Sequence, residues 1–209
     1  MARIRRRLPS RAPAVSPPRT GGRPAIDLSA APGGRQSWDR SPLTVYLWSA
    51  AELLLVYNPW QPSSRLRAAT LRAFGATVGR SVILRPRLRV RFPWKLSIGD
   101  RSWIGEDVWL HNQDLISIGP DVVISQGTFV TTGTHAYRGD MALVTRAVSI
   151  EEGVWVTARC TVLAGSTIGA NALVTPHTVV RGTVPPGTIF GAPEGAVLGP
   201  RWPDPTTEL

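Results

Sequence analysis

Three histidines are the side chains of this protein best suited to proton transfer near neutral pH. They are His111, His135 and His177, and an imidazole can accept a proton and later release it because its pKa lies near 6.5. His135 ends the segment TTGTH, residues 131–135, directly after small and hydroxyl-bearing residues. It also stands where a regular pattern of aliphatic residues stops. This position sets His135 apart from the other two histidines, although a single histidine in a loop is usually an ordinary surface residue.

The aliphatic pattern has a period of six residues from residue 78 onward. Aliphatic residues open the hexads at Val78, Leu84, Val90, Ile98, Ile104, Leu110, Ile118, Ile124, Val130, Ile150, Val156, Val162, Ile168, Val174 and Val180. A small or β-branched residue commonly lies four places later, as Ser102, Cys160 and Thr178 do. A sandwich of alternating strands would show a period of two, whereas stacked triangular coils of three short strands show a period of six. The pattern predicts an all-β fold, a parallel β-helix.

The spacing between coils is uneven, and each irregularity lies near a polar cluster. Successive coils begin 20, 20, 32 and 18 residues apart. The large excess follows His135, in HAYRGDMALVTRAVS, and predicts a loop extruded from the solenoid, which is a usual place for chemistry. A smaller excess follows HNQDL, which contains His111 and Asn112. We expect the two clusters to leave adjacent coils and to lie close together.

Charge and composition divide the chain into segments. The net charge is +10, but residues 1–40 contribute +7 of it, which leaves +3 for residues 41–209. The sequence predicts a disordered Arg/Pro-rich tail over 1–36, a helical segment over 37–75, the β-helix over 76–199 and a C-terminal tail over 200–209. Because the basic excess lies in the tail, it does not predict nucleic-acid binding. The single cysteine, Cys160, falls on an inward position and fits a reducing cytosol.

Residues 43–57, LTVYLWSAAELLLVY, form the most apolar stretch outside the repeats. The stretch is shorter than the roughly 20 residues that a spanning helix needs, and it contains Glu52. We expect a helix packed on the domain or on a neighbouring subunit; an interfacial membrane helix, with peripheral contact at the inner face of the membrane, is the alternative.

Several longer segments resemble a known family. These are NPWQPSSRLRAATLRAFGATVG, FPWKLSIGDRSWIGEDVWLHN, ISQGTFVTTGTH, VWVTARCTVLAGSTIG and VPPGTIFGAP, within residues 36–199. They resemble the left-handed β-helix acyltransferases, and more narrowly the colanic-acid biosynthesis acetyltransferases, which are relatives of the maltose and galactoside O-acetyltransferases. The resemblance implies a left-handed β-helix, a cytoplasmic homotrimer with active sites between subunits, and acetyl-CoA as co-substrate. The acceptor it implies is a hydroxyl of a saccharide or glycolipid precursor.

The resemblance also implies roles for particular residues. His135 matches the general base that activates the acceptor hydroxyl for direct attack on the acetyl thioester. Asn112 matches an asparagine of the acceptor site, and we group Asp140 with it as a residue that could orient His135. Trp155 matches an aromatic residue that lines the donor groove of a neighbouring subunit, and we expect Ala158 and Pro176 on the donor side too. Asn112 as a turn cap and Trp155 as packing at a trimer seam are the structural alternatives.

Some residues depart from the family pattern on the donor side. Pro176 has no N–H to offer the pantetheine arm, and Glu194 and Gly195 stand where small and basic residues are usual. These departures leave a non-catalytic trimeric scaffold with a decayed donor site as an alternative function. A γ-type carbonic anhydrase, with a metal held by three histidines, is a weaker alternative because the three histidines form no close pair. We therefore expect no metal.

Overall fold

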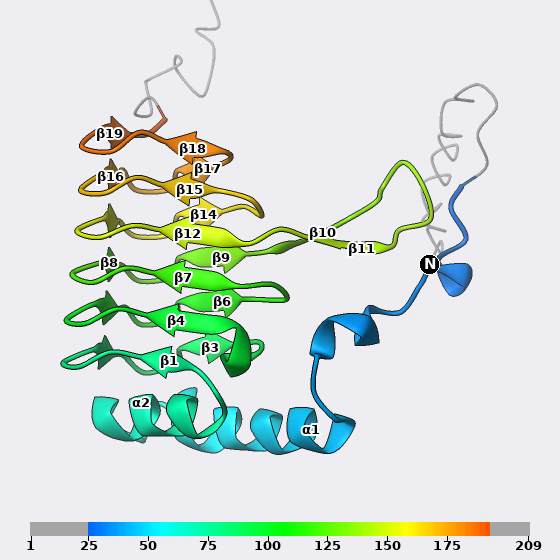
Figure 1. The fold of residues 1–209 in the computed structure, drawn as a ribbon, viewed down its shortest axis with the longest axis horizontal. Helices are drawn as coiled ribbons and strands as arrows, with labels where there is room; N and C mark the ends of the chain where they lie inside the picture. The colour runs from blue at the N-terminus through cyan, green and yellow to red at the C-terminus, as the bar shows by residue number, and fades with distance from the viewer. Residues whose placement is uncertain (1–24, 193–209) are drawn as a thin grey trace, which may run out of the picture.

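The computed structural model describes residues 25–192. Short strands form a stack of coils, two helices lie across its base, and a hairpin projects from its side (Figure 1). The expectations for the tail up to residue 24, for Glu194 and Gly195, and for residues 200–209 lie outside the described residues.

Three parallel sheets form the sides of the stack. The first sheet contains β1 (Thr77–Val78), β4 (Leu96–Ile98), β7 (Ile116–Ile118), β12 (Val148–Ile150), β15 (Thr167–Ile168) and β18 (Thr183–Val184). The second contains β2 (Ile83–Leu84), β5 (Trp103–Ile104), β8 (Val123–Ile124), β13 (Trp155–Val156), β16 (Leu173–Val174) and β19 (Ile189–Phe190). The third contains β3 (Arg89–Val90), β6 (Trp109–His111), β9 (Phe129–Thr131), β14 (Thr161–Val162) and β17 (Val179–Val180). This arrangement confirms the predicted parallel β-helix.

The core of the stack consists of the aliphatic residues that open the hexads. Every one of them is buried, with at most 8% of its surface exposed. They stack in register, as Ile98 pairs with Ile118 and Ile118 with Ile150. Each such side chain stabilises the fold by about 1.5–3 kcal/mol through burial. Cys160 is also buried, with its Sγ 3.2 Å from the Thr175 carbonyl oxygen, so it fills the core as predicted.

The corners of the coils are tightly stacked and carry ion pairs. A Cβ at Gly99 would collide with the backbone of Gly119 and Pro120 in the next coil, so this corner requires glycine. Arg101 bonds to the Asp121 carboxylate one coil later at 2.6 Å, and this bond holds the pKa of Asp121 below its usual value. Charged side chains thus link successive corners as backbone groups link successive strands.

The three sheets present different outer faces. The first presents hydroxyl groups, from Thr77, Ser97, Ser117, Ser149, Thr167 and Thr183. The second presents apolar side chains, from Ile83, Trp103, Val123, Trp155, Leu173 and Ile189. The third presents Arg89, Trp109, Phe129, Thr161 and Val179. Two of the three faces are therefore unusually apolar for a surface exposed to water.

The base of the stack is covered by α1 (Pro42–Ala51), which continues into the π-helical turn η3 (Glu52–Val56), and by α2 (Ser64–Ala73). Ser41 caps α1, with its Oγ accepting from the Thr44 N–H at 3.2 Å. Trp48 and Val56 are buried in the core of the stack, and Trp48 Nε1 donates to the Val90 carbonyl at 3.0 Å. Val45 is also buried. One face of the apolar stretch thus packs on the domain, as expected. No helix of residues 25–192 is long and apolar enough to cross a membrane.

The segment before α1 contains two short helical turns, and the first of them lies where the sequence predicts the tail. Residues 25–36, expected within the disordered tail, include η1 (Leu28–Ala30) and the start of η2 (Gly34–Trp38), both 3-10 helices. Distant residues hold η2: Trp94 Nε1 donates to the Trp38 carbonyl at 2.9 Å, and Lys95 Nζ donates to the Ser37 carbonyl at 2.6 Å. Composition could not predict contacts to residues so far away in the chain.

Candidate active site

His135 lies on the hairpin that leaves the stack between β9 and β12. The hairpin consists of β10 (Gly133–His135) and β11 (Leu143–Thr145), paired antiparallel. Its root is fixed by Thr132, which is fully buried: its carbonyl accepts from the Arg146 N–H at 2.9 Å, and its Oγ1 accepts from the Asp114 N–H at 2.8 Å. The predicted extruded loop is therefore an anchored hairpin, and the segment around His111 lies against its root.

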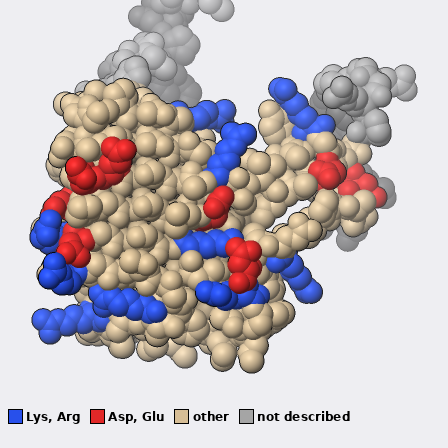
Figure 2. All heavy atoms as spheres, in the orientation of Figure 1, with Lys and Arg blue, Asp and Glu red and all other residues tan. Residues whose placement is uncertain are grey.

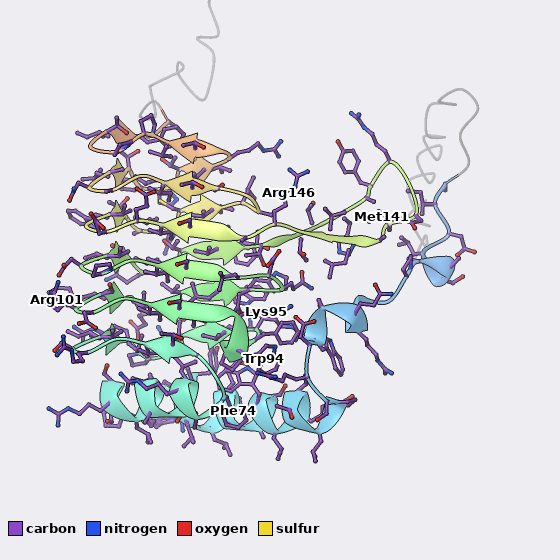
Figure 3. The ribbon with its side chains drawn as sticks, in the orientation of Figure 1. Phe74, Trp94, Lys95, Arg101, Met141 and Arg146 are labelled. Carbon is purple, nitrogen blue, oxygen red and sulfur yellow. The ribbon has the colours of Figure 1, made fainter. Side chains whose placement is uncertain are left out.

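The imidazole of His135 is oriented by a backbone carbonyl. Its Nδ1 lies 2.8 Å from the carbonyl oxygen of Met141, at the far end of the hairpin (Figure 3). A carbonyl oxygen can only accept, so Nδ1 carries a proton, and in the neutral ring Nε2 then keeps its lone pair. The side chain is exposed. His135 is thus held in the tautomer that a general base requires.

Asp140 does not contact His135. Its Oδ1 accepts from the Ala142 N–H at 2.9 Å, which stabilises the turn of the hairpin. The orienting contact that we expected from Asp140 comes instead from the neighbouring Met141 carbonyl.

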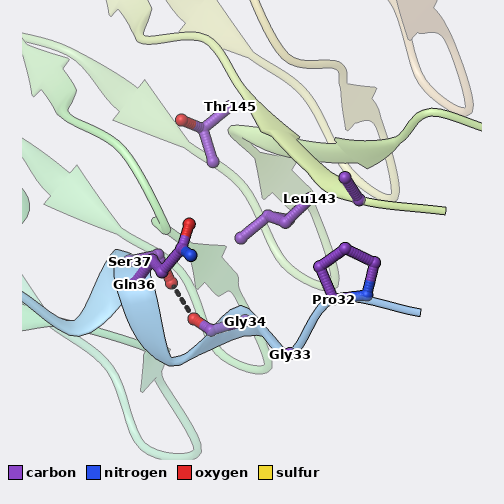
Figure 4. A pocket seen from close by; sticks show the side chains of 8 residues that line it. Pro32, Gly33, Gly34, Gln36, Ser37, Leu143 and Thr145 are labelled. Carbon is purple, nitrogen blue, oxygen red and sulfur yellow. Dashed lines mark hydrogen bonds between the residues drawn. The ribbon is translucent and has the colours of Figure 1, made fainter. Parts of the chain in front are cut away.

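One face of the hairpin borders a pocket that also includes the segment before α1. His135 pairs with Leu143, and Gly133 with Thr145, so these four residues share a face. Leu143 and Thr145 line a pocket of about 220 Å³ together with residues 32–34, Gln36 and Ser37, and the last two supply polar side chains (Figure 4). Because of this shared face, His135 lies on the same side of the hairpin as the pocket.

The opposite face of the hairpin borders a basic pocket. Thr134 and Arg146 line a space of about 340 Å³ with Leu163 and Arg181. Arg146 lies at the root of the hairpin (Figure 3), and no acidic side chain lines this pocket. Two guanidinium groups at one pocket suit an anionic ligand such as a phosphate.

Sequence reasoning did not identify Arg146, Arg181, Gln36 or Ser37. The two arginines could have been found from the repeat, because Arg146 lies two residues before a strand of the first sheet and Arg181 directly follows one of the third. Both therefore lie at the corner between these sheets. No local signal in the sequence brings residues 36 and 37 to the hairpin.

Asn112 is bonded to the backbone of the preceding coil. It is fully buried, its Oδ1 accepts from the Phe92 N–H at 3.0 Å, and its Nδ2 donates to the carbonyls of Phe92 at 2.6 Å and Lys95 at 3.0 Å. The amide thus holds the turn around η4 (Pro93–Lys95) in the preceding coil. Asn112 is not among the residues that line either pocket at the hairpin, and its contacts fit the turn-capping alternative, whereas its acceptor-site role stays a prediction.

The residues expected on the donor side lie at a different corner from His135. Ala158 follows β13 and Pro176 follows β16, so both lie between the second and third sheets, and the His177 N–H donates to the Ala158 carbonyl at 3.1 Å. Trp155, on the second sheet, is half-exposed and donates from Nε1 to the Ser125 Oγ at 3.0 Å. The hairpin leaves from the corner between the third and first sheets. One chain therefore does not bring these residues to its own His135.

The other two histidines have separate surroundings. His111 lies on the third sheet among Trp109 and Phe129, and its Nδ1 lies 3.1 Å from the Thr131 Oγ1. Burial, followed by the nearby charges of Arg91 and Arg89, lowers the pKa of His111. His177 occupies an exposed corner with a φ of 59°. Among residues 25–192, no group of three or more His, Cys, Asp or Glu side chains could hold a metal ion.

Comparisons with known proteins identify relatives both by sequence and by structure. The chain is 32% identical over 162 residues to WcaF of Escherichia coli K12, a colanic acid biosynthesis acetyltransferase, and the match covers 76% of this chain and 88% of WcaF. Among solved structures, the hexapeptide-repeat acetyltransferase VCA0836 of Vibrio cholerae, in complex with acetyl-CoA, superimposes with a TM-score of 0.66 at 25% identity over 72% of this chain and 82% of that one.

A maltose O-acetyltransferase from Clostridium difficile shares the fold, with a TM-score of 0.65 at 18% identity over 78% of this chain and 94% of that one. No protein-family model matches the chain. The solenoid, the extruded histidine hairpin and the extent of the WcaF match lead to one conclusion. The chain belongs to the colanic acid biosynthesis acetyltransferase family and is an acyltransferase of the hexapeptide-repeat class.

Proposed function

We propose that the protein transfers an acetyl group from acetyl-CoA to a hydroxyl of a saccharide or glycolipid precursor, with His135 as the general base. The observation that carries this proposal is the contact between Nδ1 of His135 and the Met141 carbonyl, which leaves Nε2 free and exposed on the hairpin. WcaF and VCA0836 are acetyltransferases by name, and the latter was solved with acetyl-CoA.

The proposed reaction needs one proton carrier and no covalent enzyme intermediate. Nε2 of His135 accepts the proton of the acceptor hydroxyl as its oxygen attacks the thioester carbonyl carbon. The Met141 carbonyl stabilises the resulting imidazolium through the Nδ1–H bond. When the carbon–sulfur bond breaks, His135 returns the proton to the thiolate, and the products are the acetyl ester and free CoA. Positioning of donor and acceptor supplies much of the rate.

The basic pocket favours a donor that carries phosphates. Arg146 and Arg181 line it beside Thr134, and guanidinium groups pair well with phosphate oxygens. These two cations offer a substitute for the basic residue that Gly195 replaces. The missing N–H of Pro176 removes one hydrogen bond to the donor, so binding depends more strongly on charge. We expect Arg181→Ala to weaken acetyl-CoA binding about tenfold or more in calorimetry.

We propose a homotrimer with sites between subunits. A ring of identical subunits needs two different contact faces, and the apolar second sheet and the aromatic third sheet are two such faces. The first sheet, with its row of hydroxyl groups, then faces solvent. A neighbouring chain would also bring its own Trp155 and donor-side corner toward the His135 hairpin, which a single chain does not do.

The trimer is tested by one pair of variants. Trp155→Glu places a charge on the apolar second sheet, and Thr167→Glu places the same charge on the first sheet. We expect light scattering to show a trimer for the wild type and for Thr167→Glu, and monomers for Trp155→Glu. Equal masses for both variants would contradict this assignment of the faces.

The acceptor side is proposed to be the pocket formed with residues 32–37. It lies on the His135 face of the hairpin, and its hydroxyl, amide and backbone groups suit hydrogen bonds to a sugar. An acetyl-CoA-dependent reaction and a single buried cysteine both fit the cytoplasm.

The proposal is tested first by calorimetric titration of acetyl-CoA, since this requires no knowledge of the acceptor. Saturable binding at about one donor per subunit supports the transferase. We expect His135→Ala to bind with similar affinity, because the base contacts the acceptor. If the intact trimer did not bind acetyl-CoA, the scaffold alternative would be favoured instead.

A further inference from the structure

The helices under the stack expose a continuous apolar surface. Leu43, Tyr46, Leu47, Leu53 and Leu54, which we call the basal face, are each between 55% and 68% exposed. All lie in α1 or η3, and Trp60, 90% exposed, follows directly in the turn to α2. Val45, Trp48 and Val56 are the buried residues of the same helices. Packing within the chain therefore does not require the outward residues to be apolar.

No charge interrupts the basal face. Glu52 is the single ionisable acid or base between residues 41 and 60 apart from tyrosine, and it turns toward the stack. Its Oε1 accepts from the Val90 N–H at 2.6 Å, and burial raises the pKa of its carboxyl group. The one residue that would oppose contact with a hydrocarbon surface therefore points away from it.

Two exposed arginines flank the helices of the basal face in the chain. Exposed Arg40 precedes α1 and exposed Arg65 lies in the first turn of α2. Lysine and arginine side chains border the uncharged lower surface in the space-filling view (Figure 2). An apolar face bordered by arginines is complementary to anionic lipid, which attracts the cations and receives the leucines.

We propose that the basal face binds the surface of an anionic phospholipid bilayer, with α1 and η3 lying in the plane of the interface. These helices run across the base of the stack (Figure 1), so their outward side can lie flat on a surface while the hairpin remains above it. Their 15 residues extend about 22 Å, which suits a helix lying on a membrane and is too short for one that crosses it. This inference stands on the basal face and does not depend on acetyl transfer.

Vesicle flotation with the full-length protein tests the inference. The vesicles contain phosphatidylcholine alone or phosphatidylcholine with phosphatidylglycerol. We expect the wild type to float with the anionic vesicles, to bind the neutral vesicles much less, and to be released by high salt. The double variant Leu47→Ser/Leu54→Ser should bind anionic vesicles at least tenfold less. Leu28→Ser, a matched change at an exposed leucine outside the basal face, should bind as the wild type does.

Circular dichroism and light scattering on the same samples separate the outcomes. The inference requires that the double variant keeps its fold and its oligomeric mass while it loses vesicle binding. It is overturned if the wild type does not bind anionic vesicles, or if the double variant binds as well as the wild type. It is also overturned if the double variant changes oligomeric mass, because the basal face would then be covered by a second copy of the chain.

Discussion

Replacing Asn112 by alanine should reduce stability strongly. The substitution removes three buried hydrogen bonds, two to Phe92 and one to Lys95. The Phe92 carbonyl keeps the Lys95 N–H as a partner, but the Phe92 N–H loses the acceptor that the amide provides. A buried polar group without a partner costs about 1–3 kcal/mol, and the cavity left by the amide adds about 1 kcal/mol. We expect the free energy of unfolding to fall by about 3 kcal/mol.

Urea unfolding followed by tryptophan fluorescence, at one fixed protein concentration, measures this change for Asn112→Ala. Asn58→Ala is the matched control, because Asn58 makes local hydrogen bonds to Leu54 and Trp60 near the surface. The control should lose less than about 1 kcal/mol. If Asn112→Ala kept its stability and lost only acceptor turnover, our assignment of Asn112 as a structural residue would be refuted.

Three further predictions concern the coil corner, the hairpin and pH. Gly99→Ala should lower the free energy of unfolding by about 1–3 kcal/mol in thermal unfolding, because the added Cβ meets the next coil. Gly33→Ala should leave this free energy unchanged, because nothing lies within 4 Å of its added Cβ. Equal losses for the two variants would contradict the close stacking at Gly99. Asp140→Asn retains an acceptor for the Ala142 N–H, so transfer should stay within about threefold of wild type; a hundredfold loss would indicate a direct role for the carboxylate. The pKa of His111 is lower in the folded protein than in the unfolded chain, so as the pH falls the unfolded chain takes up this proton before the folded protein does. The free energy of unfolding should therefore decrease as the pH is lowered from about 7 to 5. In His111→Gln that fall should be smaller, and an identical fall would contradict the assignment.

The repeating part of the fold could be predicted from the sequence because each hexad specifies its own inward residue. Val78 through Val180 are buried where the period of six places them. The hairpin could be predicted too, since residues inserted between stacked coils must leave the stack. In both cases local spacing is enough to determine the structure.

The parts that could not be predicted depend on contacts between distant residues. Trp94 and Lys95 order the segment around Ser37, and composition alone had placed this segment's start in a disordered tail. The direction of the Asn112 amide depends on the turn in the preceding coil. The orienting contact to His135 comes from a backbone carbonyl, which has no sequence signature.

The central claim is that Nε2 of His135 acts as a base toward an acceptor oxygen. The most direct measurement is the release of free CoA thiol from acetyl-CoA with water as a poor acceptor, for the wild type and His135→Ala at saturating donor. A general base contributes about 100-fold to 10,000-fold to a rate, so we predict that the variant loses at least 100-fold while its affinity for acetyl-CoA, measured by calorimetry, is unchanged. Equal rates of thiol release at equal donor occupancy would contradict the account.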